Sequence, residues 1–316
     1  MQMNFEMLNQ IISGYRPARV LHVAGSLDIF TILADQPMTA EALATVCKAK
    51  PDVLDKILIA CAAMGLLEKS GGRYRTTPFA NTYLVRGSKL YQGHIIAHSA
   101  SLWDSWGGLE FAVRNTPKPP EDVHRSFIMG MYDISMAGRT KALAGSVDLT
   151  GRKKLLDVGG GPGTYSIELC RRFPGLNASV FDLPETVAIA REVIEAEGMS
   201  DRVSVIAGDW DTDGFGEGND VVLMSNILHG PGSRAEMKLQ KAFESMAGGG
   251  LLIIQDFVLN DEKTGPLVPA LFNIMLGAYS RPELFGLIEN AGFARPRVVT
   301  MIEEAGSMVI EAEKAP

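Results

Sequence analysis

Apolar residues recur with two different periods along the chain. Up to about residue 150 they follow helical spacing, and beyond it short apolar runs alternate with amphipathic stretches. The spacing over 17–34 predicts a first helix. Thr39 is a suitable N-cap for a second helix, and Pro51 suits the first turn of a third, which ends at Gly65. The N-terminal part is therefore expected to be mainly helical.

Residues 66–76 depart from this helical pattern. They form two strand-like stretches around Ser70, Gly71 and Gly72, which predicts a hairpin. Helices followed by a hairpin are typical of a winged helix, a fold that often reads DNA with a basic helix. The charges in 39–67 balance and the helix after Pro51 is mostly apolar, so the pattern favours packing against protein over DNA reading.

The stretch 94–145 is expected to be helical, with an interruption at the prolines of 117–120. It carries large apolar or pliable side chains, which either line a small-molecule pocket or form ordinary core. The sequence leaves both interpretations open. These side chains are Trp103, Trp106, Phe127, Met129, Met131 and Met136.

After Lys153 short strands and helices alternate. This alternation predicts an α/β fold in which helices cover both faces of a parallel sheet. At the end, 297–302 and 307–313 flank a short turn, which indicates an antiparallel hairpin. The expected strands are 155–158, 179–182, 203–207, 221–224 and 251–257, and the expected helices begin at Thr164, Glu185, Ser233 and Pro282.

Composition excludes several classes of function. The chain has 46% hydrophobic and 21% charged residues, which is typical of a globular protein, and its net charge of -7 disfavours a large basic surface for nucleic acid or an anionic membrane, while a locally basic patch stays open. The N-terminus lacks the pattern of a secretion signal, and the uncharged run 264–280 is too interrupted for a membrane span. We therefore expect a cytoplasmic protein with no nucleic-acid or membrane partner. Cys47, Cys61 and Cys170 are expected to be buried thiols, and no metal site is expected from His22, His94, His98 and His124.

Candidate chemistry gathers at the predicted strand ends. Gly159 and Gly161 follow the first strand, where they serve either a tight turn or the close approach of a ligand. Asp182 ends the second strand and is placed to accept hydrogen bonds from ribose hydroxyls. Asp209 follows the third, where it is suited to an adenine amino group beside Trp210. Because the carboxyl ends of parallel strands share one edge, these features converge on a single crevice.

In their order, these motifs resemble the class I S-adenosylmethionine-dependent methyltransferases, and more narrowly the caffeic acid/hydroxyindole-type O-methyltransferase family. The resemblance covers nearly the whole chain. It implies a Rossmann-like seven-stranded sheet with a C-terminal antiparallel hairpin, preceded by a winged-helix dimerisation domain. A dehydrogenase is disfavoured, because the predicted sheet of this chain ends in a hairpin, which is the pattern of a methyltransferase. The matching motifs are DVGGGPG at 157–163, FDLP at 181–184, GDW at 208–210, NILH at 226–229 and the stretch 280–293.

The resemblance implies three segments and a set of site residues. The segments are a dimerisation domain over 1–95, a helical connector over 96–150 that contributes to the substrate pocket, and a cofactor-binding catalytic domain over 151–316. The implied contacts to S-adenosylmethionine are Gly159, Gly161, Asp182, Leu183, Asp209, Trp210, Ser225 and Ser135. The implied substrate contacts are Trp103, Phe127, Met131, Phe272 and Met275.

His229 matches the catalytic position of the family. Histidine has an ordinary pKa of about 6.5 and suits the removal of a proton from a phenol, whose pKa is about 10. Asp256 matches one of the two carboxylates that orient this base. The segment 277–281 offers no second carboxylate, so Tyr279 or Asp256 alone would orient the ring.

The sequence thus predicts a homodimeric methyltransferase that acts on a hydroxyl of a small aromatic or heteroaromatic metabolite. Apolar helical faces at 17–34 and 51–66 support pairing through the N-terminal domain. The missing second carboxylate leaves two alternatives open, namely methyl transfer to nitrogen or carbon and a relative that does not transfer methyl. A cofactor-sensing winged-helix regulator is a further alternative.

Overall fold

A computed structural model describes the fold of the chain. Its contacts divide the chain into two compact units. The first is Met1–Pro119 with Leu259–Met275, and the second is Pro120–Val258 with Leu276–Pro316. The described residues are 4–114, 122–302 and 306–316, so the proline interruption at 117–120 lies outside them.

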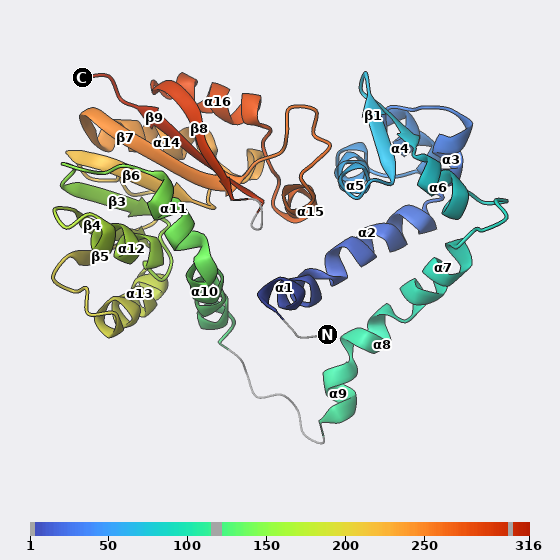
Figure 1. The fold of residues 1–316 in the computed structure, drawn as a ribbon, viewed down its shortest axis with the longest axis horizontal. Helices are drawn as coiled ribbons and strands as arrows, with labels where there is room; N and C mark the ends of the chain where they lie inside the picture. Colours follow the sequence, from blue (N-terminus) through green and yellow to red (C-terminus); the bar gives the residue numbers. More distant parts are fainter. Residues whose placement is uncertain (1–3, 115–121, 303–305) are drawn as a thin grey trace. The chain divides into compact units, whose positions relative to one another are not determined.

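The first unit is helical with one short hairpin (Figure 1). Thr39 caps the second predicted helix by accepting the N–H of Ala42, and Gly71 and Gly72 make the predicted turn with φ of 55° and 74°. The elements are α1 (Phe5–Ser13), α2 (Tyr15–Ser26), α3 (Ile29–Asp35), α4 (Ala40–Cys47), α5 (Pro51–Ala63), β1 (Leu67–Ser70), β2 (Arg73–Thr76), α6 (Pro78–Tyr83), α7 (Gly93–Ser101), α8 (Trp103–Gly107) and α9 (Leu109–Val113).

The prediction of one continuous helix over 17–34 is wrong. The chain breaks between α2 and α3, where Asp28 adopts the left-handed conformation with φ of 54°. Aspartate tolerates this conformation better than most residues, because its short side chain bonds locally. Here its Oδ1 accepts the hydroxyl of Thr31 at 2.7 Å. The apolar period continues across the break and hides it.

A segment distant in sequence completes the first unit. Helix α15 (Leu267–Met275) packs against α5, and Leu271 joins the buried cluster that contains Leu54 and Leu58. This helix falls in the uncharged run for which no element was predicted. The described residues contain no single helix that is long and apolar enough to cross a membrane, although residues 5–26 and 29–35, bent by 59°, pass that test as a pair.

The second unit is built on the seven-stranded sheet that was predicted. Its strand order is β5-β4-β3-β6-β7-β9-β8, with β3 to β7 parallel and the last two strands antiparallel. Its elements are α10 (Val123–Ile134), η1 (Ser135–Arg139), α11 (Thr140–Ser146), β3 (Lys154–Val158), α12 (Thr164–Arg172), β4 (Asn177–Asp182), α13 (Pro184–Ala196), β5 (Val203–Ala207), β6 (Asn219–Ser225), η2 (Pro231–Ser233), α14 (Ala235–Ser245), β7 (Met246–Phe257), α16 (Arg281–Asn290), β8 (Ala294–Ile302) and β9 (Ser307–Glu313).

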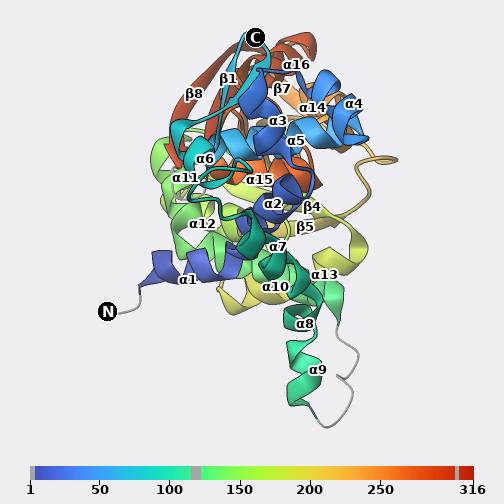
Figure 2. The ribbon, with the colours of Figure 1, turned by 90° about the vertical axis from the view of Figure 1, so that its right-hand side faces the viewer.

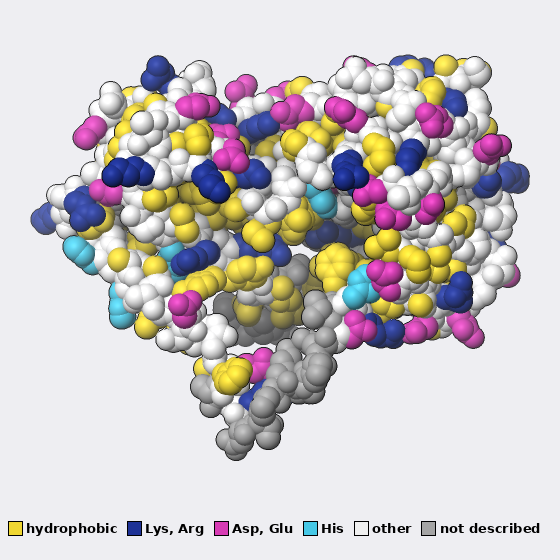
Figure 3. Space-filling model, turned by 180° about the vertical axis from the view of Figure 1, so that it is seen from behind, with side chains coloured by type: hydrophobic (Ala, Val, Ile, Leu, Met, Phe, Trp, Pro, Cys, Tyr) yellow, Lys and Arg dark blue, Asp and Glu magenta, His cyan; other side chains and the backbone are white. Residues whose placement is uncertain are grey.

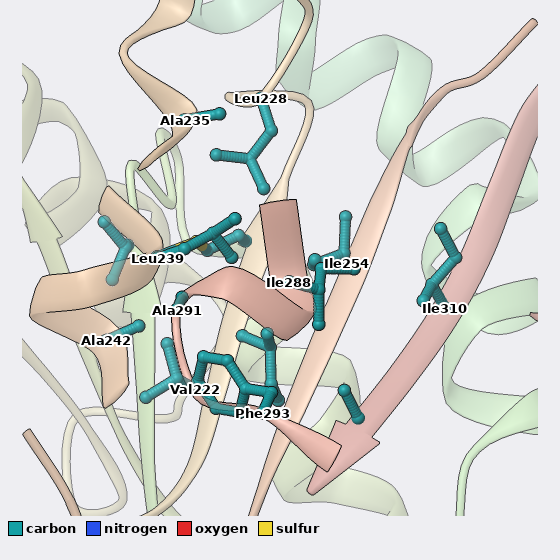
Figure 4. Close-up of a cluster of buried hydrophobic side chains, with 14 of the residues drawn as sticks. Val222, Leu228, Ala235, Leu239, Ala242, Ile254, Ile288, Ala291, Phe293 and Ile310 are labelled. Atoms are coloured by element: carbon teal, nitrogen blue, oxygen red, sulfur yellow. The ribbon is translucent and has the colours of Figure 1, made fainter. Parts of the chain in front are cut away.

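Hydrophobic side chains on both faces hold this sheet between helices. On β6, Val221 and Leu223 join the cluster under α11, α12 and α13, while Val222 and Met224 join the cluster under α14 and α16. Figures 1 and 2 show these helices beside the sheet. In Figure 4, Leu239 of α14, Ile288 of α16 and Ile254 of the sheet lie in one cluster. Burial on both faces fixes the carboxyl ends of the strands, from which the site is built.

Candidate active site

The glycine loop after β3 combines tight packing with open space. Gly159 and Gly161 have φ of 65° and 55°, a conformation that favours glycine. A Cβ at Gly159 would lie 2.9 Å from Cγ2 of Ile227 and 3.0 Å from the ring of Trp210. At Gly161 no described heavy atom lies within 4 Å of the same position. The loop is therefore held closely on one side and leaves room for a ligand at Gly161.

Asp182 ties this loop to the end of β4. Its Oδ2 accepts the N–H of Gly161 at 2.9 Å, and its Oδ1 accepts the N–H of Leu183 at 2.8 Å. A carboxylate has about four lone-pair sites, so these bonds leave capacity for further donors such as ribose hydroxyls. Three of the predicted cofactor residues thus lie together.

Asp209 and Trp210 follow β5. Oδ1 of Asp209 accepts the N–H of Asp211 at 2.8 Å, which fixes the turn. The Trp210 ring lies against the glycine loop on one side, and Nζ of Lys238 lies 3.8 Å from its ring centroid. The sequence reasoning missed this lysine, although it occupies a position between the buried Ala235 and Leu239 of α14, where a charge is unusual.

Lys238 joins two parts of the site. Its ammonium donates to the carbonyl of Ile227 at 2.8 Å, and its side chain is buried. Desolvation lowers the pKa of Lys238 to about 8. The lysine therefore holds the chain that leads to His229 and packs on Trp210 at the same time.

The two predicted serines also lie near the glycine loop. Oγ of Ser135 lies 2.8 Å from Oγ1 of Thr164, the first residue of α12 after the loop. Ser225 ends β6, and the register that pairs Met224 with Val158 places it beside the start of the loop. Both serines therefore lie near the carboxyl edge of the sheet, and their contact with a cofactor stays a prediction.

His229 and Asp256 form the pair that the sequence predicts. Nδ1 of the imidazole lies 2.8 Å from Oδ1 of Asp256, a carboxylate that is 1% exposed. This carboxylate also accepts the backbone N–H groups of Leu228 and Phe257 at 2.8 and 2.7 Å. The imidazole stacks on the Phe257 ring with centroids 6.0 Å apart. The Asp256 carboxylate thus fixes the position of the histidine ring.

The opposite ring nitrogen of His229 faces a different environment. The side chain is 19% exposed, and Nε2 makes no hydrogen bond within the described part of the chain. With Nδ1 held by a carboxylate, Nε2 is the atom that can accept a proton from a ligand.

The segment that lacks the second carboxylate lies directly beside His229. Gly230 has φ of 143°, and a Cβ there would be 2.9 Å from the backbone N of Ala278. Only glycine permits this close approach, which explains the residue after the histidine. Among the described residues no hydrogen bond joins Tyr279 to His229, and Asp256 is the one carboxylate that bonds the imidazole.

The predicted substrate residues fall in both units. On α10 of the second unit, Phe127 and Met131 are 58% and 38% exposed and lie one helical turn apart, hence on one face. In the first unit the Trp103 ring lies 5.1 Å from the Arg19 guanidinium, the Phe272 ring lies 4.5 Å from that of Arg16, and Met275 is exposed. Their contact with a substrate stays a prediction.

The second unit also has a hollow away from these residues. It measures about 1080 Å³ and lies beside the amino-terminal end of β3, where Arg152, Lys153, Arg172 and Arg297 line it together with acidic and loop residues. In parallel sheets ligands bind at the carboxyl ends of the strands, so this hollow is not the candidate active site.

Comparison with known proteins decides the family. Residues 99–294 match the O-methyltransferase domain, and residues 9–86 match the O-methyltransferase dimerisation domain. The chain belongs to the O-methyltransferase family. It is 34% identical to 3-hydroxy-5-methyl-1-naphthoate 3-O-methyltransferase of Streptomyces sahachiroi, over 98% of this chain and 95% of that protein.

Solved structures agree with this membership. An O-methyltransferase family 2 protein of Planctomyces limnophilus, in complex with apigenin, has a TM-score of 0.80 and 29% identity over 100% of this chain and 97% of that one. Human N-acetylserotonin methyltransferase in complex with S-adenosylmethionine shares the fold, with a TM-score of 0.56 and 22% identity over 100% and 99% of the two chains. The enzyme is an O-methyltransferase whose cofactor is S-adenosylmethionine. Within the described residues no group of three or more His, Cys, Asp or Glu side chains is placed to bind a metal.

Proposed function

We propose that this enzyme methylates a hydroxyl of a small aromatic or heteroaromatic metabolite with His229 as the general base. The observation that carries the proposal is the His229–Asp256 pair, in which Nδ1 is bonded and Nε2 is open. The pair lies at the same carboxyl edge of the sheet as the glycine loop and Asp182. One edge thus supplies both a cofactor site and a base.

The residues at this edge fit S-adenosylmethionine. The open space at Gly161 admits a ligand beside the backbone, and Asp182 keeps acceptor capacity for ribose hydroxyls. Asp209 and Trp210 supply an acceptor and an aromatic face for the adenine. The remaining proposed contacts are Gly159, Leu183, Ser225 and Ser135.

When bound, the cofactor supplies a methyl group on a cationic sulfur, so the chain itself has two tasks. It must hold the acceptor hydroxyl in line with that methyl, and it must take the hydroxyl proton. Nε2 of His229 takes the proton, and the Asp256 carboxylate stabilises the imidazolium that forms. Asp256 is a positioning residue, since it acts through the histidine.

An aromatic acceptor suits the apolar side chains proposed to contact it. Phe127 and Met131 present an aromatic ring and a pliable thioether on one face of α10. The names of two relatives, a hydroxynaphthoate methyltransferase and a protein in complex with apigenin, describe aromatic compounds with hydroxyl groups. Trp103, Phe272 and Met275 are further proposed contacts from the first unit.

Methyl transfer is tested with a cofactor that carries an isotopically labelled methyl. The enzyme is incubated with phenols, catechols, hydroxyindoles and hydroxylated heterocycles, and the products are analysed by mass. We expect a labelled methyl ether from at least one acceptor, and we expect His229→Ala to abolish its formation while cofactor binding persists. Label on nitrogen or carbon, or release of the cofactor product without labelled acceptor, would refute O-methylation.

We further propose a homodimer formed through the N-terminal domain. Hydrophobic side chains reach the visible surface in Figure 3, and the first unit exposes several large apolar side chains. On α1, Ile11 and Ile12 are 68% and 62% exposed, and Trp106 and Phe111 on α8 and α9 are 70% and 83% exposed. A second copy of the chain would cover such side chains. A monomer mass by light scattering at micromolar concentration would contradict this.

The cytoplasmic location and the lack of a nucleic-acid or membrane partner also remain proposals. The net charge of -7 supports them, since it leaves little basic surface for anionic polymers or lipids. The hairpin of β1 and β2 with the preceding helices is proposed to be a winged helix that serves pairing. Binding to DNA that weakens with rising salt would overturn this view.

A further inference from the structure

Arg139 lies on a kinked segment that is fastened to the glycine loop. It is the last residue of η1, a short segment with a kink at Ala137 and Gly138, which lies between α10 and α11 in the chain. Gly138 just before it has φ of 119°, and Ser135 at the start of η1 bonds Thr164 at the beginning of α12. The kinked segment is thus held against the part of the chain that the proposed cofactor site uses.

The guanidinium of Arg139 is half-buried, and none of the described carboxylates pairs with it. Its Cζ lies 5.9 Å from the centroid of the Phe257 ring, and the hydroxyl of Tyr165 is the ionisable group that acts on it. Desolvation lowers the pKa of Arg139. In the described residues no ion pair or hydrogen bond satisfies its side chain. A charge removed from water in this way is costly unless an anion accompanies it.

Other arginines of the second unit show the contrast. Arg125 on α10 pairs with Glu192 at 2.7 Å, and Arg171 on α12 pairs with Glu197 at 2.8 Å. Both of these arginines are more exposed than Arg139. Of these three arginines, Arg139 is the least exposed, and it is the one without a carboxylate partner among the described residues.

The position of Arg139 places this cation near the reacting groups. The Phe257 ring has the His229 imidazole 6.0 Å from its centroid and the Arg139 guanidinium 5.9 Å from it. We propose that Arg139 binds a carboxylate of a bound ligand, which is either the methionine carboxylate of the cofactor or a carboxylate on the acceptor. This inference rests on the proposed function. A guanidinium offers two parallel N–H donors to a carboxylate, which fixes orientation as well as affinity.

The test replaces the guanidinium and measures binding as well as turnover. Arg139→Gln and Arg139→Lys are compared with Arg125→Gln, the matched control on the same helical segment, after each variant is shown to melt cooperatively. Calorimetry gives the affinities for S-adenosylhomocysteine and for 5′-methylthioadenosine, which lacks the amino-acid portion. Acceptors found in the labelled-methyl screen are tested as carboxylic acids and as their methyl esters.

Each source of the carboxylate has its own signature. If the carboxylate belongs to the cofactor, Arg139→Gln lowers the affinity for S-adenosylhomocysteine about 10- to 100-fold and leaves the affinity for 5′-methylthioadenosine unchanged. If it belongs to the acceptor, cofactor affinity is unchanged, and KM rises by a similar factor for the acid but not for the ester. Arg139→Lys is expected to recover part of either loss, because it keeps the charge without the paired donors.

Two results overturn the inference. In one, Arg139→Gln keeps the affinity for S-adenosylhomocysteine and no acceptor in the screen depends on Arg139 through a carboxylate. In the other, Arg139→Gln lowers the affinity for every ligand by the same factor, which indicates general damage to the structure of the site. A wild-type enzyme that binds S-adenosylhomocysteine but methylates nothing in the screen refutes the proposed function, whereas the calorimetric comparison still decides the role of Arg139 toward the cofactor.

Discussion

Replacing Asp256 with Asn separates the orientation of His229 from the rest of the site. The substitution keeps the size of the side chain and one acceptor oxygen, but it removes the charge 2.8 Å from Nδ1. The imidazolium formed on proton transfer then lacks its counter-charge, and an amide N–H facing Nδ1 favours the wrong tautomer. We expect kcat to fall about 10²- to 10⁴-fold, which corresponds to about 3–5 kcal/mol of transition-state stabilisation.

The same substitution also affects folding, and the size of that effect follows from the hydrogen bonds. Asp256 accepts two backbone N–H groups as well as the imidazole, and it is 1% exposed. Weakening these charge-assisted bonds is expected to lower the free energy of unfolding by about 1–3 kcal/mol. Urea unfolding measures this loss, and calorimetry with S-adenosylhomocysteine is expected to show an unchanged cofactor site.

Asp220→Asn is the matched control for this experiment. Oδ2 of Asp220 accepts the N–H groups of Lys153 and Lys154 at 2.6 and 3.0 Å, at the opposite end of β6 from His229. The Asp220→Asn variant should lose some free energy of unfolding but keep the turnover of wild type. The reasoning is refuted if Asp256→Asn keeps the kcat of the Asp220 control, or if its cofactor affinity falls as far as its kcat.

Three further predictions concern the surroundings of the site. Gly159→Ala should lower the affinity for S-adenosylhomocysteine at least about tenfold in calorimetry, because the new Cβ would lie 2.9 Å from Cγ2 of Ile227. Gly198 has the same φ of 65° but no neighbour within 4 Å of a new Cβ, so Gly198→Ala is the control and should leave this affinity unchanged. Burial raises the pKa of Asp157 to about 7 from its ordinary 3.8, so its ionisation destabilises the fold as the pH rises between these values. Urea titrations should therefore show that the unfolding free energy of Asp157→Asn rises relative to that of wild type by up to about 4 kcal/mol between pH 4 and pH 8. A difference between the two proteins that stays constant over this pH range contradicts the prediction. Lys238→Met should lower cofactor affinity by shifting Trp210, with the loss visible in quenching of tryptophan fluorescence, and an unchanged titration would exclude that role.

The sequence predicted those parts of the fold whose signals are local. Short apolar runs that alternate with amphipathic stretches predicted the parallel sheet, and two strand-like stretches around a short turn predicted its terminal hairpin. The break at Asp28 could not be predicted, because the apolar period continues through it and a single left-handed residue has no strong signature. Nor could the packing of α15 on α5, since it joins segments about 200 residues apart in the chain.

For the candidate site, the sequence signals are local as well, and the roles of its residues stay predictions. Asp182, His229 and Asp256 follow strands at recognisable positions, and the structure gives them the neighbours that the prediction requires. Lys238 and Arg139 were missed because a charged residue within a helix usually faces water. Lys238 is buried and Arg139 is half-buried, and both environments depend on how distant elements pack.

The central claim is that His229 removes the proton of the acceptor hydroxyl, and a series of phenolic acceptors with different pKa values tests it most directly. Product formation with labelled cofactor is measured at pH 7.5 for wild type and His229→Ala, using phenols with pKa values from about 10 down to about 7. The account predicts a large loss of kcat/KM for the least acidic phenols and a much smaller loss for those already ionised in solution. An equal loss across the series, or full turnover by His229→Ala, would contradict it.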